Sequence, residues 1–350
     1  MTDAWWQPAR TPLPRGAIAV SVEDASSVGD ARRAAVTLCE SLGLGDAFCG
    51  EAALVATELA GNLAKHARGG IFLAQPMPAP LGPGVELVTV DHGPGMADVA
   101  RAMQDGFSTS GTPGTGLGAV RRAADELLLD SRPGMGTVLV ARLRPRGAPG
   151  VRGAPLIGVV NVPAPGEQLC GDAWAVAADD GPAARVVMVV ADGLGHGEAA
   201  AEAAQAALRV FRDTGARGEL VELLRHMHGA LRATRGAAVG VVVVDAGRAR
   251  FAGVGNIAGV IVTPDESRSM VSHNGIVGHQ MPRVREFEYP CPPDALVILT
   301  SDGLQTRWRL DAYPGLEAAH PALVAATLWR DHTRGRDDAT ALVLRAGATT

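Results

Sequence analysis

The run from Val88 to Gly118, VTVDHGPGMADVARAMQDGFSTSGTPGTGLG, decides how the first part of this 350-residue chain folds. It begins with an apolar strand that ends at Asp91 and continues as a tight Asp-His-Gly-Pro-Gly turn. A helical segment follows, and a stretch rich in Gly, Ser and Thr then opens into another helix near Leu117. Strand, acidic residue, flexible turn and glycine-rich helix entry, in this order, predict a nucleotide pocket.

The turn and the glycine run each have a chemical reason to contact a nucleotide. The Asp91 carboxylate can accept a hydrogen bond from an amino-bearing ring, and Gly93 and Gly95 let the backbone approach that ring closely. An aspartate that only initiates a turn is the alternative interpretation. Free backbone N–H groups at the helix entry form a cradle for phosphate. The glycines of this entry are Gly111, Gly114, Gly116 and Gly118.

A long helix expected over residues 46–67 carries Glu58 and Asn62 four residues apart, so their side chains share one face. The amide oxygen can complete a magnesium shell that also uses phosphate oxygens, and the carboxylate can accept a proton from an attacking hydroxyl. Taken alone, the pair is also typical of an ordinary polar helix face. Lys65, the only lysine of the chain, fits either a phosphate contact or a solvated helix position.

Periodicity around these residues predicts a mixed α/β unit. Strands are expected at 17–22, 71–75, 85–90 and 137–143, and helices at 29–42, 46–67 and 117–127.

The motifs TELAGNLAKHA, DHGPGM, DGFSTSGTPGTGLGAVRR and GMGTVLV resemble, in this order, those of the GHKL-type ATPases. Among these they are most similar to the RsbT-type switch kinases of bacterial stress-response modules. The resemblance covers residues 17–143. It implies a GHKL (Bergerat) α/β sandwich that binds ATP with Mg²⁺ and phosphorylates a serine or threonine of a small STAS-domain protein.

The same resemblance implies roles for individual residues. Glu58 would be the catalytic base, Asn62 the magnesium ligand and Asp91 the acid that reads adenine. Residues 107–110 would belong to a mobile lid. The remaining nucleotide-binding residues would be Gly93, Gly95, Gly114, Gly116, Gly118 and Thr137. Some members of the family act instead as anti-sigma factors that sequester a sigma subunit.

A linker separates the two halves of the chain. Residues 144–155 read RPRGAPGVRGAP, which is rich in Pro, Gly and Arg and lacks apolar periodicity. The sequence therefore predicts a loose arm at 1–15, an ATP-binding domain at 16–144, a linker at 145–155 and a second domain at 156–350.

The second half alternates many short apolar runs with paired helical stretches, which favours a layered α/β or α+β sandwich. Strands are expected at 157–162, 173–178, 185–191, 238–244, 249–253, 259–262, 296–300 and 339–345, and helices at 197–212, 220–233 and 321–331. Residues 262–290 carry the least motif content.

Aspartates recur at the ends of these apolar runs. A single Asp-Gly after a strand is an ordinary turn, but four acidic sites in matching context argue against coincidence. Two carboxylates about 4 Å apart repel by roughly 4 kcal/mol at an effective dielectric of 20, so such a cluster needs divalent cations or protonation. Oxygen ligands without clustered His or Cys favour Mg²⁺ or Mn²⁺ over zinc, and two such ions can activate water for phosphate-ester hydrolysis.

The runs CGDAW, ADGLGHG, GNIAGV, TSDGL and RDDATALVL resemble those of PP2C-type phosphatases in the bacterial SpoIIE/RsbX branch. The resemblance implies a serine/threonine phosphoprotein phosphatase with a central β-sandwich flanked by helices (α-β-β-α). Two Mn²⁺ or Mg²⁺ ions would be held by Asp172, Asp192, Asp302, Asp337 and the Gly193 carbonyl, with Asp192 and Asp302 catalytic.

Three further residues have less certain places in this resemblance. Asp338 stands where the wider superfamily has asparagine. His196 would either aid proton transfer or be a packed or capping residue, and Asn256 would fix a turn.

Composition narrows the remaining possibilities. Hydrophobic residues make up 47% and charged residues 20% of the chain, as in a globular protein with real cores. A net charge of −5 with scattered arginines gives no footprint for nucleic acid or an anionic membrane. The four cysteines form no CxxC pair, and no apolar run is long enough to span a bilayer, so a cytoplasmic location is expected.

The sequence as a whole predicts a kinase–phosphatase fusion that acts on a STAS-domain phosphoprotein of a stress-response module. A sigma factor or a downstream phosphatase is a further possible partner. The alternative is that the first domain is a non-catalytic, ATP-dependent anti-sigma or partner-binding module that gates the phosphatase. The oligomeric state does not follow from the sequence.

Overall fold

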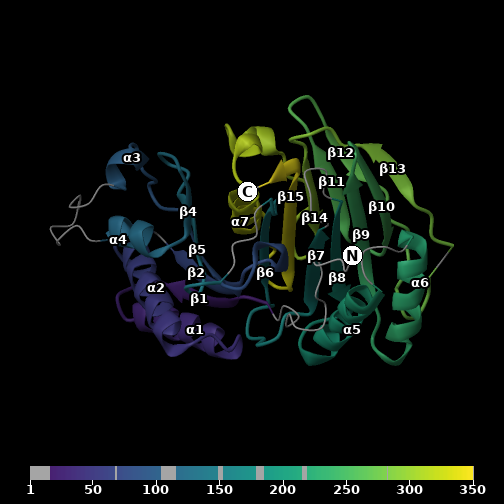
Figure 1. Ribbon diagram of the computed structural model, residues 1–350, viewed down its shortest axis with the longest axis horizontal. Coiled ribbons are helices and arrows are strands. Elements are labelled where there is room, and N and C mark those ends of the chain that lie inside the picture. Colours follow the sequence, from purple (N-terminus) through teal and green to yellow (C-terminus); the bar gives the residue numbers. More distant parts are fainter. Residues whose placement is uncertain are drawn as a thin grey trace. The chain divides into compact units, whose positions relative to one another are not determined.

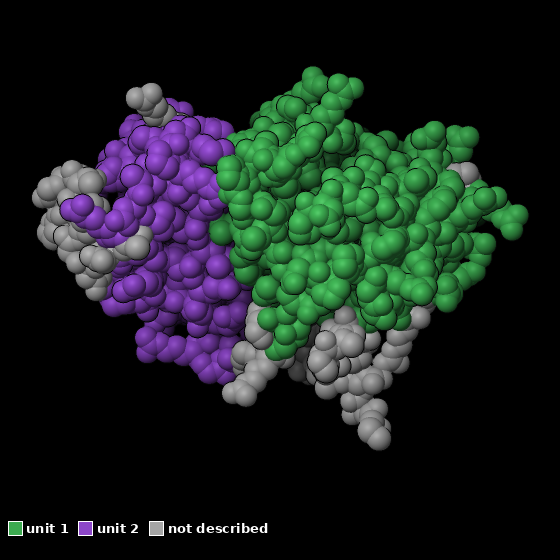
Figure 2. Space-filling view, turned by 90° about the horizontal axis from the view of Figure 1, so that it is seen from above, with its two compact units in different colours: residues 1–16, 78–81, 151–350 green, residues 17–77, 82–150 purple. Residues whose placement is uncertain are grey.

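The computed structural model describes residues 16–67, 69–103, 116–148, 153–178, 185–214, 219–281 and 283–349. These residues form two compact units, drawn in different colours in Figure 2. The smaller unit comprises residues 17–77 and 82–150, and the larger one comprises 1–16, 78–81 and 151–350. Gly114 and the expected lid at 107–110 lie outside the described residues.

The smaller unit, called the ATPase-like unit below, has one five-stranded antiparallel sheet in the order β1-β2-β3-β5-β4. Its strands are β1 (Ile18–Val22), β2 (Gly70–Pro76), β3 (Val85–Asp91), β4 (Glu126–Ser131) and β5 (Thr137–Leu143). The helices of this stretch of chain are α1 (Val28–Ser41), α2 (Asp46–His66), η1 (Ala79–Leu81), α3 (Val99–Ala102) and α4 (Gly116–Ala123). Figure 1 shows α1 and α2 side by side along one face of this sheet.

Helical spacing of apolar residues explains why α1 and α2 pack on that sheet face. On α2 the buried positions Ala52, Ala56, Leu59 and Leu63 recur every three or four residues, which places them on one side of the helix. They join a core with alternate residues of the strands, such as Leu87. Burial of this apolar surface is the main stabilising contribution to the unit.

The opposite face of the sheet buries an ionic cluster that the sequence did not reveal. Arg142 is fully buried and donates from Nε to Glu86 Oε2 at 2.7 Å and from Nη1 to Glu126 Oε2 at 2.8 Å. Gln75 donates to the other Glu86 oxygen at 2.7 Å. All four are cross-strand neighbours on β2, β3, β5 and β4. Burial opposes the charge of Arg142, but the two carboxylates outweigh it and raise the pKa of this guanidinium above its ordinary value.

The larger unit, called the acidic-site unit below, stacks two five-stranded sheets. Their orders are β13-β10-β9-β8-β7 and β12-β11-β14-β15-β6. The strands are β6 (Pro155–Val162), β7 (Asp172–Ala178), β8 (Val186–Gly193), β9 (Ala237–Asp245), β10 (Arg248–Val254), β11 (Ala258–Val262), β12 (Ser267–Met270), β13 (Phe287–Pro290), β14 (Leu296–Thr300) and β15 (Ala339–Thr349). The helices are α5 (Glu198–Thr214), α6 (Leu220–Ala230), η2 (Leu231–Ala233), η3 (Leu310–Ala312), η4 (Leu316–Ala318) and α7 (Pro321–His332).

Three apolar layers hold this unit together. Side chains from both sheets, including Trp174, Phe251 and Leu342, fill the space between the sheets. A second layer, with Phe211 and Met227, lies between the first sheet and the helices α5 and α6. On the outer face of the second sheet, α7 packs against β6 and β15 (Figure 1). The α-β-β-α architecture expected from the sequence is therefore confirmed.

Gly158 explains how closely α7 approaches its sheet. A Cβ at this position would lie 2.1 Å from the backbone nitrogen of Ala322 in the first turn of α7. The helix begins at Pro321, and the His320 ring accepts a hydrogen bond from the same Ala322 N–H at 3.0 Å. The first turn of the helix thus rests directly on the strand backbone.

Most expected elements are present within one to three residues of their predicted ends, and three are corrected. The helix expected over 117–127 ends at Ala123, and Glu126–Ser131 is strand β4, because its apolar residues pair with β5. Strands β12 and β13 were not predicted, since Ser267–Met270 is three-quarters exposed and reads as a polar loop. The last strand also runs past Arg345 to Thr349.

No helix among the described residues is long and apolar enough to cross a membrane.

We expect Gly158→Ala to lower the free energy of unfolding by about 1–3 kcal/mol, because α7 must move off the sheet to admit the methyl group. Gly229→Ala is the matched control in the same unit. It lies exposed on α6 with no heavy atom within 4 Å of its built Cβ, so it should stabilise by roughly 0.5–1 kcal/mol. Urea unfolding measures both, and equal effects of the two variants would contradict the close approach.

Candidate active sites

Asp91 ends β3 and is nearly buried, at 8% exposed. Its Oδ1 accepts hydrogen bonds from the backbone N–H groups of Gly93 at 2.7 Å and Thr137 at 3.2 Å. Thr137 begins β5, the neighbouring strand, and is the cross-strand partner of Asp91. One carboxylate oxygen therefore fixes both the turn after β3 and the start of β5.

Two glycines allow this turn to pack directly against the β4–β5 hairpin. Gly95 has a φ of +67°, and a Cβ on it would lie 1.9 Å from the Arg132 carbonyl oxygen. Gly136 has a φ of +73°, and its Cβ would lie 2.0 Å from the Asp91 carbonyl oxygen. The Ser131 hydroxyl closes the same contact by accepting from the Met96 N–H at 2.9 Å. The turn and the hairpin therefore meet backbone to backbone, with no room for a side chain at Gly95 or Gly136.

Helix α2 delivers Glu58 and Asn62 to this turn. A Cβ on Gly93 would lie 3.0 Å from the His66 carbonyl oxygen, so the end of α2 abuts the Asp91 turn. At 1.5 Å rise per residue, Asn62 lies about 6 Å and Glu58 about 12 Å back along the helix from His66. Both side chains are half-buried, and no described group hydrogen-bonds to the buried Asn62 Nδ2. An external partner would satisfy that amide.

The glycine-rich helix entry is described in part. Gly116 begins α4 and Gly118 lies in its first turn, while Gly114 is outside the described residues. Helix α4 packs against α2, the helix that carries Glu58 and Asn62. Lys65 is exposed at the end of α2, which agrees with the solvated alternative.

In the acidic-site unit, the topology brings the predicted aspartates to one end of the sandwich. Asp172 and Asp192 are cross-strand partners on β7 and β8. Asp302 comes directly after β14, and Asp337 lies just before β15, which pairs with β14. The Ser301 hydroxyl, next to Asp302, donates to Asp172 at 2.6 Å, so the two sheets bring their aspartates to the same end.

Asp172 is 1% exposed and spans the two sheets. Its Oδ2 accepts hydrogen bonds from the hydroxyls of Ser301 at 2.6 Å and Thr340 at 2.8 Å. No described group hydrogen-bonds to its buried Oδ1. Burial raises the pKa of Asp172 to about 7, against the lowering effect of the two hydroxyls and with a further rise from Asp338 and Asp302.

The pKa of Asp192 is raised further than that of Asp172. Burial, and then repulsion by Asp172, Asp302 and the two aspartates before β15, raises its pKa from 3.8 to about 9. The pKa of Asp302 is also raised, first by burial and then by Asp337, although Arg334 and the hydrogen bond from Asn256 oppose the rise. Without cations, protons must neutralise part of this group at neutral pH.

Asp338 is buried, in contrast to the half-buried Asp337. Its Oδ1 accepts the Ala164 N–H at 2.9 Å, whereas no described group hydrogen-bonds to the buried Oδ2. A Cβ on Gly171, next to Asp172, would lie 2.5 Å from that Oδ2. Asp338 thus positions the loop between β6 and β7 beside Asp172.

Two side chains were interpreted too narrowly from the sequence. The Asn256 amide donates to Asp302 Oδ2 at 2.6 Å, so it orients a site carboxylate in addition to its place in a bend. The expectation that His196 is packed or caps a helix is wrong: its side chain is 62% exposed, and Nδ1 lies 2.7 Å from Glu167 Oε1. Contacts between residues 29 and 46 positions apart leave no periodic signal in a sequence.

The donor set fits a divalent cation of the Mg²⁺ or Mn²⁺ type. The available ligands are carboxylate oxygens, two of them buried without a partner among the described groups, and these aspartates repel one another strongly. As they stand, no three acidic, imidazole or thiol side chains of the described residues already form a complete cation site. Gly193, the last residue of β8, has no room for a side chain because its Cβ would lie 2.0 Å from the Ala200 carbonyl oxygen.

Comparison with known protein families assigns both halves of the chain. Residues 21–143 match the family described as Histidine kinase-like ATPase domain, and residues 182–347 match Stage II sporulation protein E (SpoIIE). The chain is 34% identical over 111 residues to the serine/threonine-protein kinase RsbT of Bacillus subtilis (strain 168), covering 32% of this chain and 84% of RsbT.

Solved structures similar to this chain were also found. One of them is described as "The bacterial stressosome: a modular system that has been adapted to control secondary messenger signaling". Its sequence is 28% identical to that of this chain. Its TM-score is 0.50, and the match covers 98% of that protein and 54% of this chain. RsbX in complex with magnesium is 19% identical with a TM-score of 0.45, over 54% of this chain and 94% of RsbX. The family matches confirm both resemblances drawn from the motifs.

We expect Asp192→Asn to stabilise the metal-free protein above pH 5. Because the folded-state pKa is raised, the folded protein binds more protons than the unfolded chain between pH 3.8 and about 9, so its stability falls as pH rises through that window. The amide removes this loss. One pKa unit corresponds to about 1.4 kcal/mol, so the gain over wild type at pH 8 in chelator should exceed that value.

Denaturant unfolding at pH 5 and pH 8 measures this difference, which should grow with pH. Asp265→Asn, an exposed position in the turn between β11 and β12, is the control and should change little at either pH. A variant less stable than wild type at pH 8 in chelator would show that Asp192 is not electrostatically strained.

Proposed function

Since the chain belongs, through its ATPase-like unit, to the family of the RsbT serine/threonine kinase and carries a SpoIIE-type PP2C phosphatase unit C-terminal to it, we propose that it is a bifunctional regulator of a bacterial partner-switching module. The first unit phosphorylates a serine or threonine of a STAS-domain protein with ATP. The second unit dephosphorylates a phosphoserine or phosphothreonine protein. The observation that carries the proposal is the gathering of Asp172, Asp192, Asp302 and Asp337 at one end of the sandwich.

In the kinase reaction, the Asp91 carboxylate accepts a hydrogen bond from the adenine amino group, and Gly93 and Gly95 let the backbone approach the ring closely. Backbone N–H groups at the start of α4, with Gly116 and Gly118, bind phosphate oxygens. Glu58 accepts the proton of the attacking hydroxyl. The Asn62 amide oxygen would hold Mg²⁺, which would neutralise charge on the phosphates.

In the phosphatase reaction, two Mn²⁺ or Mg²⁺ ions would be held by Asp172, Asp192, Asp302 and Asp337, with the Gly193 carbonyl. These ions would supply Lewis acidity and lower the pKa of water at the phosphate ester. The protein's own contribution is orientation. Asn256 fixes Asp302, and the hydroxyls of Ser301 and Thr340 fix Asp172. The exposed His196, paired with Glu167, is available to protonate the leaving serine oxygen.

Joining the two activities gives each a high local concentration at a shared target. With an ATP-binding domain at 16–144, a linker at 145–155 and a phosphatase domain at 156–350, a linker that lets both domains reach one target would give an effective concentration in roughly the millimolar range. The partner we propose is a STAS-domain phosphoprotein that in turn controls a sigma factor or a downstream phosphatase.

For the kinase, we expect Glu58→Gln to reduce phosphate transfer from radiolabelled ATP to a STAS-domain protein by about 10²- to 10⁴-fold while ATP still binds. Asp91→Asn should lose ATP binding itself. The remaining side-chain oxygen can keep the two backbone hydrogen bonds, but the amide nitrogen that replaces Oδ2 is a donor and would face the donor amino group of adenine. Glu51→Gln, on the same helix but paired with the exposed Arg146, is the matched control.

If the wild-type protein binds ATP and transfers no phosphate to any STAS-domain candidate, the kinase proposal is wrong. The first unit is then a nucleotide-dependent binding module of the anti-sigma kind.

For the phosphatase, we expect Asp302→Asn to abolish Mn²⁺-dependent release of phosphate from a phosphoserine peptide. Mn²⁺ at about 100 times its dissociation constant should stabilise the wild-type protein by roughly 2.7 kcal/mol and should not stabilise the variant. Thermal unfolding with and without Mn²⁺ gives this second readout independently of turnover. Turnover that persists in excess chelator would refute the metal-dependent mechanism, and Asp265→Asn again serves as the control.

A further inference from the structure

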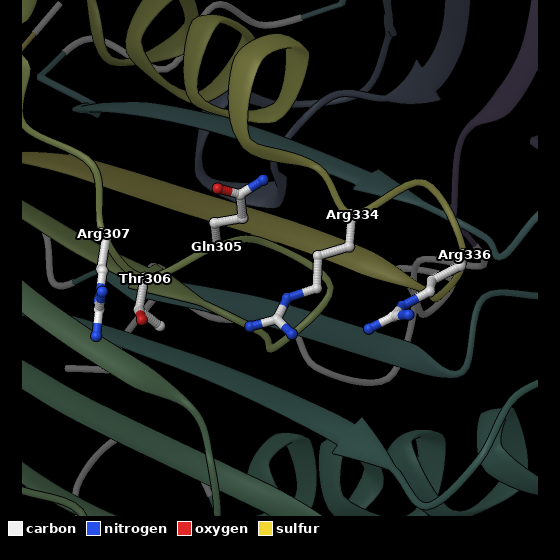
Figure 3. Close-up of a pocket in the computed structure, with 5 residues that line it drawn as sticks. All are labelled: Gln305, Thr306, Arg307, Arg334 and Arg336. Carbon is white, nitrogen blue, oxygen red and sulfur yellow. The ribbon is translucent and has the colours of Figure 1, made fainter.

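Beside the aspartates, the surface of the acidic-site unit contains a hollow lined with arginine. It has a volume of about 480 Å³ and is lined by Gln305, Thr306, Arg307, Arg334 and Arg336. All five residues are exposed, so the hollow is an open depression rather than an enclosed cavity. In Figure 3 the guanidinium groups of Arg334 and Arg336 extend from one loop toward the segment that carries Thr306 and Arg307.

The hollow is built from the two chain segments that also carry site aspartates. Residues 305–307 follow Asp302 at the end of β14, and residues 334–336 lead into Asp337 before β15. Main-chain hydrogen bonds join the two segments: the Arg334 N–H donates to the Gly303 carbonyl and the Gln305 N–H donates to the His332 carbonyl, each at 2.8 Å. The arginines are therefore held at a fixed place next to the carboxylates.

The described part of the chain offers the arginines of this hollow no salt-bridge partner. Arg307, Arg334 and Arg336 make no ion pair with any carboxylate in the described part of the chain, although Arg334 acts electrostatically on Asp302. Nearby arginines behave differently, since Arg309 pairs with Asp311 and Arg330 pairs with Asp331. In a chain with a net charge of −5, three such guanidinium groups in one hollow form a local site for an anion.

We propose that this hollow binds acidic residues that flank the phosphorylated serine or threonine of the substrate protein. This inference rests on the proposed phosphatase function and names the class of its substrate: a phosphoprotein with Asp or Glu close to the phosphosite. Guanidinium groups pair with carboxylates through two parallel hydrogen bonds. Gln305 and Thr306 add neutral hydrogen-bonding groups suited to a peptide backbone.

Size and shape favour a peptide over the phosphate group alone. A volume of about 480 Å³ is within the range of roughly 300–1,000 Å³ found for small-molecule sites, which is far more than one phosphate group fills. The open side lets an extended chain enter and leave. The acidic residues of such a substrate would be repelled by the site aspartates. The arginines of the hollow offset this repulsion.

The test compares two phosphoserine peptides of equal length with the full-length protein and Mn²⁺. One peptide carries Asp and Glu around the phosphoserine, and the other carries Asn and Gln at the same positions. Each exposed guanidinium–carboxylate pair changes a binding constant by a factor of roughly 1.5 to 5, so kcat/KM should favour the acidic peptide by about tenfold at low salt. The difference should lie in KM and shrink as ionic strength rises.

Substitution of the arginines then tests whether the preference for the acidic peptide arises in the hollow. In the double variant R307Q/R336Q the ratio of the two kcat/KM values should fall to the factor of roughly 1.5 to 5 that Arg334 alone supplies. Arg209→Gln, which removes an exposed arginine of α5 about 16 Å along the helix from its start at Glu198, should leave the ratio at the wild-type value. Because a ratio is compared, any change in metal affinity common to both peptides cancels.

Failure of this inference is distinct from failure of the proposed function. If wild type hydrolyses both peptides equally, the hollow does not select acidic substrates and the phosphatase proposal stands. If it hydrolyses neither peptide nor p-nitrophenyl phosphate, the phosphatase proposal fails. Fluorescence anisotropy of the labelled acidic peptide then still tests whether the hollow binds acidic residues. Binding that R307Q/R336Q weakens about tenfold supports it, and binding that is absent or insensitive to the double variant overturns it.

Discussion

Repulsion among aspartates at the end of the β-sandwich is the constraint on which the larger unit depends. The fold places Asp172 and Asp192 opposite each other on adjacent strands and brings Asp302 and Asp337 to the same end from the second sheet. At about 4 Å and an effective dielectric of 20, each such pair costs roughly 4 kcal/mol. The groups that hydrogen-bond to Asp172 and Asp302 are neutral hydroxyls and an amide. Negative charge is therefore preserved for cations instead of being cancelled within the protein.

The candidate site of the ATPase-like unit differs from that of the acidic-site unit, because it depends more on close backbone contacts than on charge. One carboxylate oxygen of Asp91 accepts the hydrogen bonds that hold the turn and the start of β5 together. Gly95 and Gly136 permit backbone contacts that any side chain would block. These contacts fix the position of the Asp91 carboxylate without the use of a second charged group. The two units thus show opposite ways of preparing a binding site, by exclusion of side chains in one and by accumulation of like charge in the other.

Sequence patterns predicted the parts of this protein in which local signals agree with the final structure. Apolar runs bounded by Gly or Asp gave most strands, and the 3.6-residue period gave α2 and α5. The segment from Glu126 to Ser131 was missed because its three leucines fit a helix as well as a strand, and only pairing with β5 decides between them. Motif order predicted which aspartates would meet. The contact of Asn256 with Asp302, the buried Arg142 cluster and the arginine hollow depend on register between distant segments, for which one sequence carries no signal.

The hydrogen bonds of Asp172 have a consequence for how such chains diverge. Because Ser301 and Thr340 reach Asp172 from the other sheet, and Asn161 in turn donates to Thr340 at 2.7 Å, this aspartate clamps the two sheets as well as facing the site. A descendant that has lost turnover would still keep Asp172 together with its three polar partners, since the fold requires them as a set. Asp192 carries only strain when no cation is bound, so an inactive copy would lose it early. Inspection of Asp192, rather than of Asp172, therefore distinguishes a working enzyme from a pseudoenzyme within such a lineage.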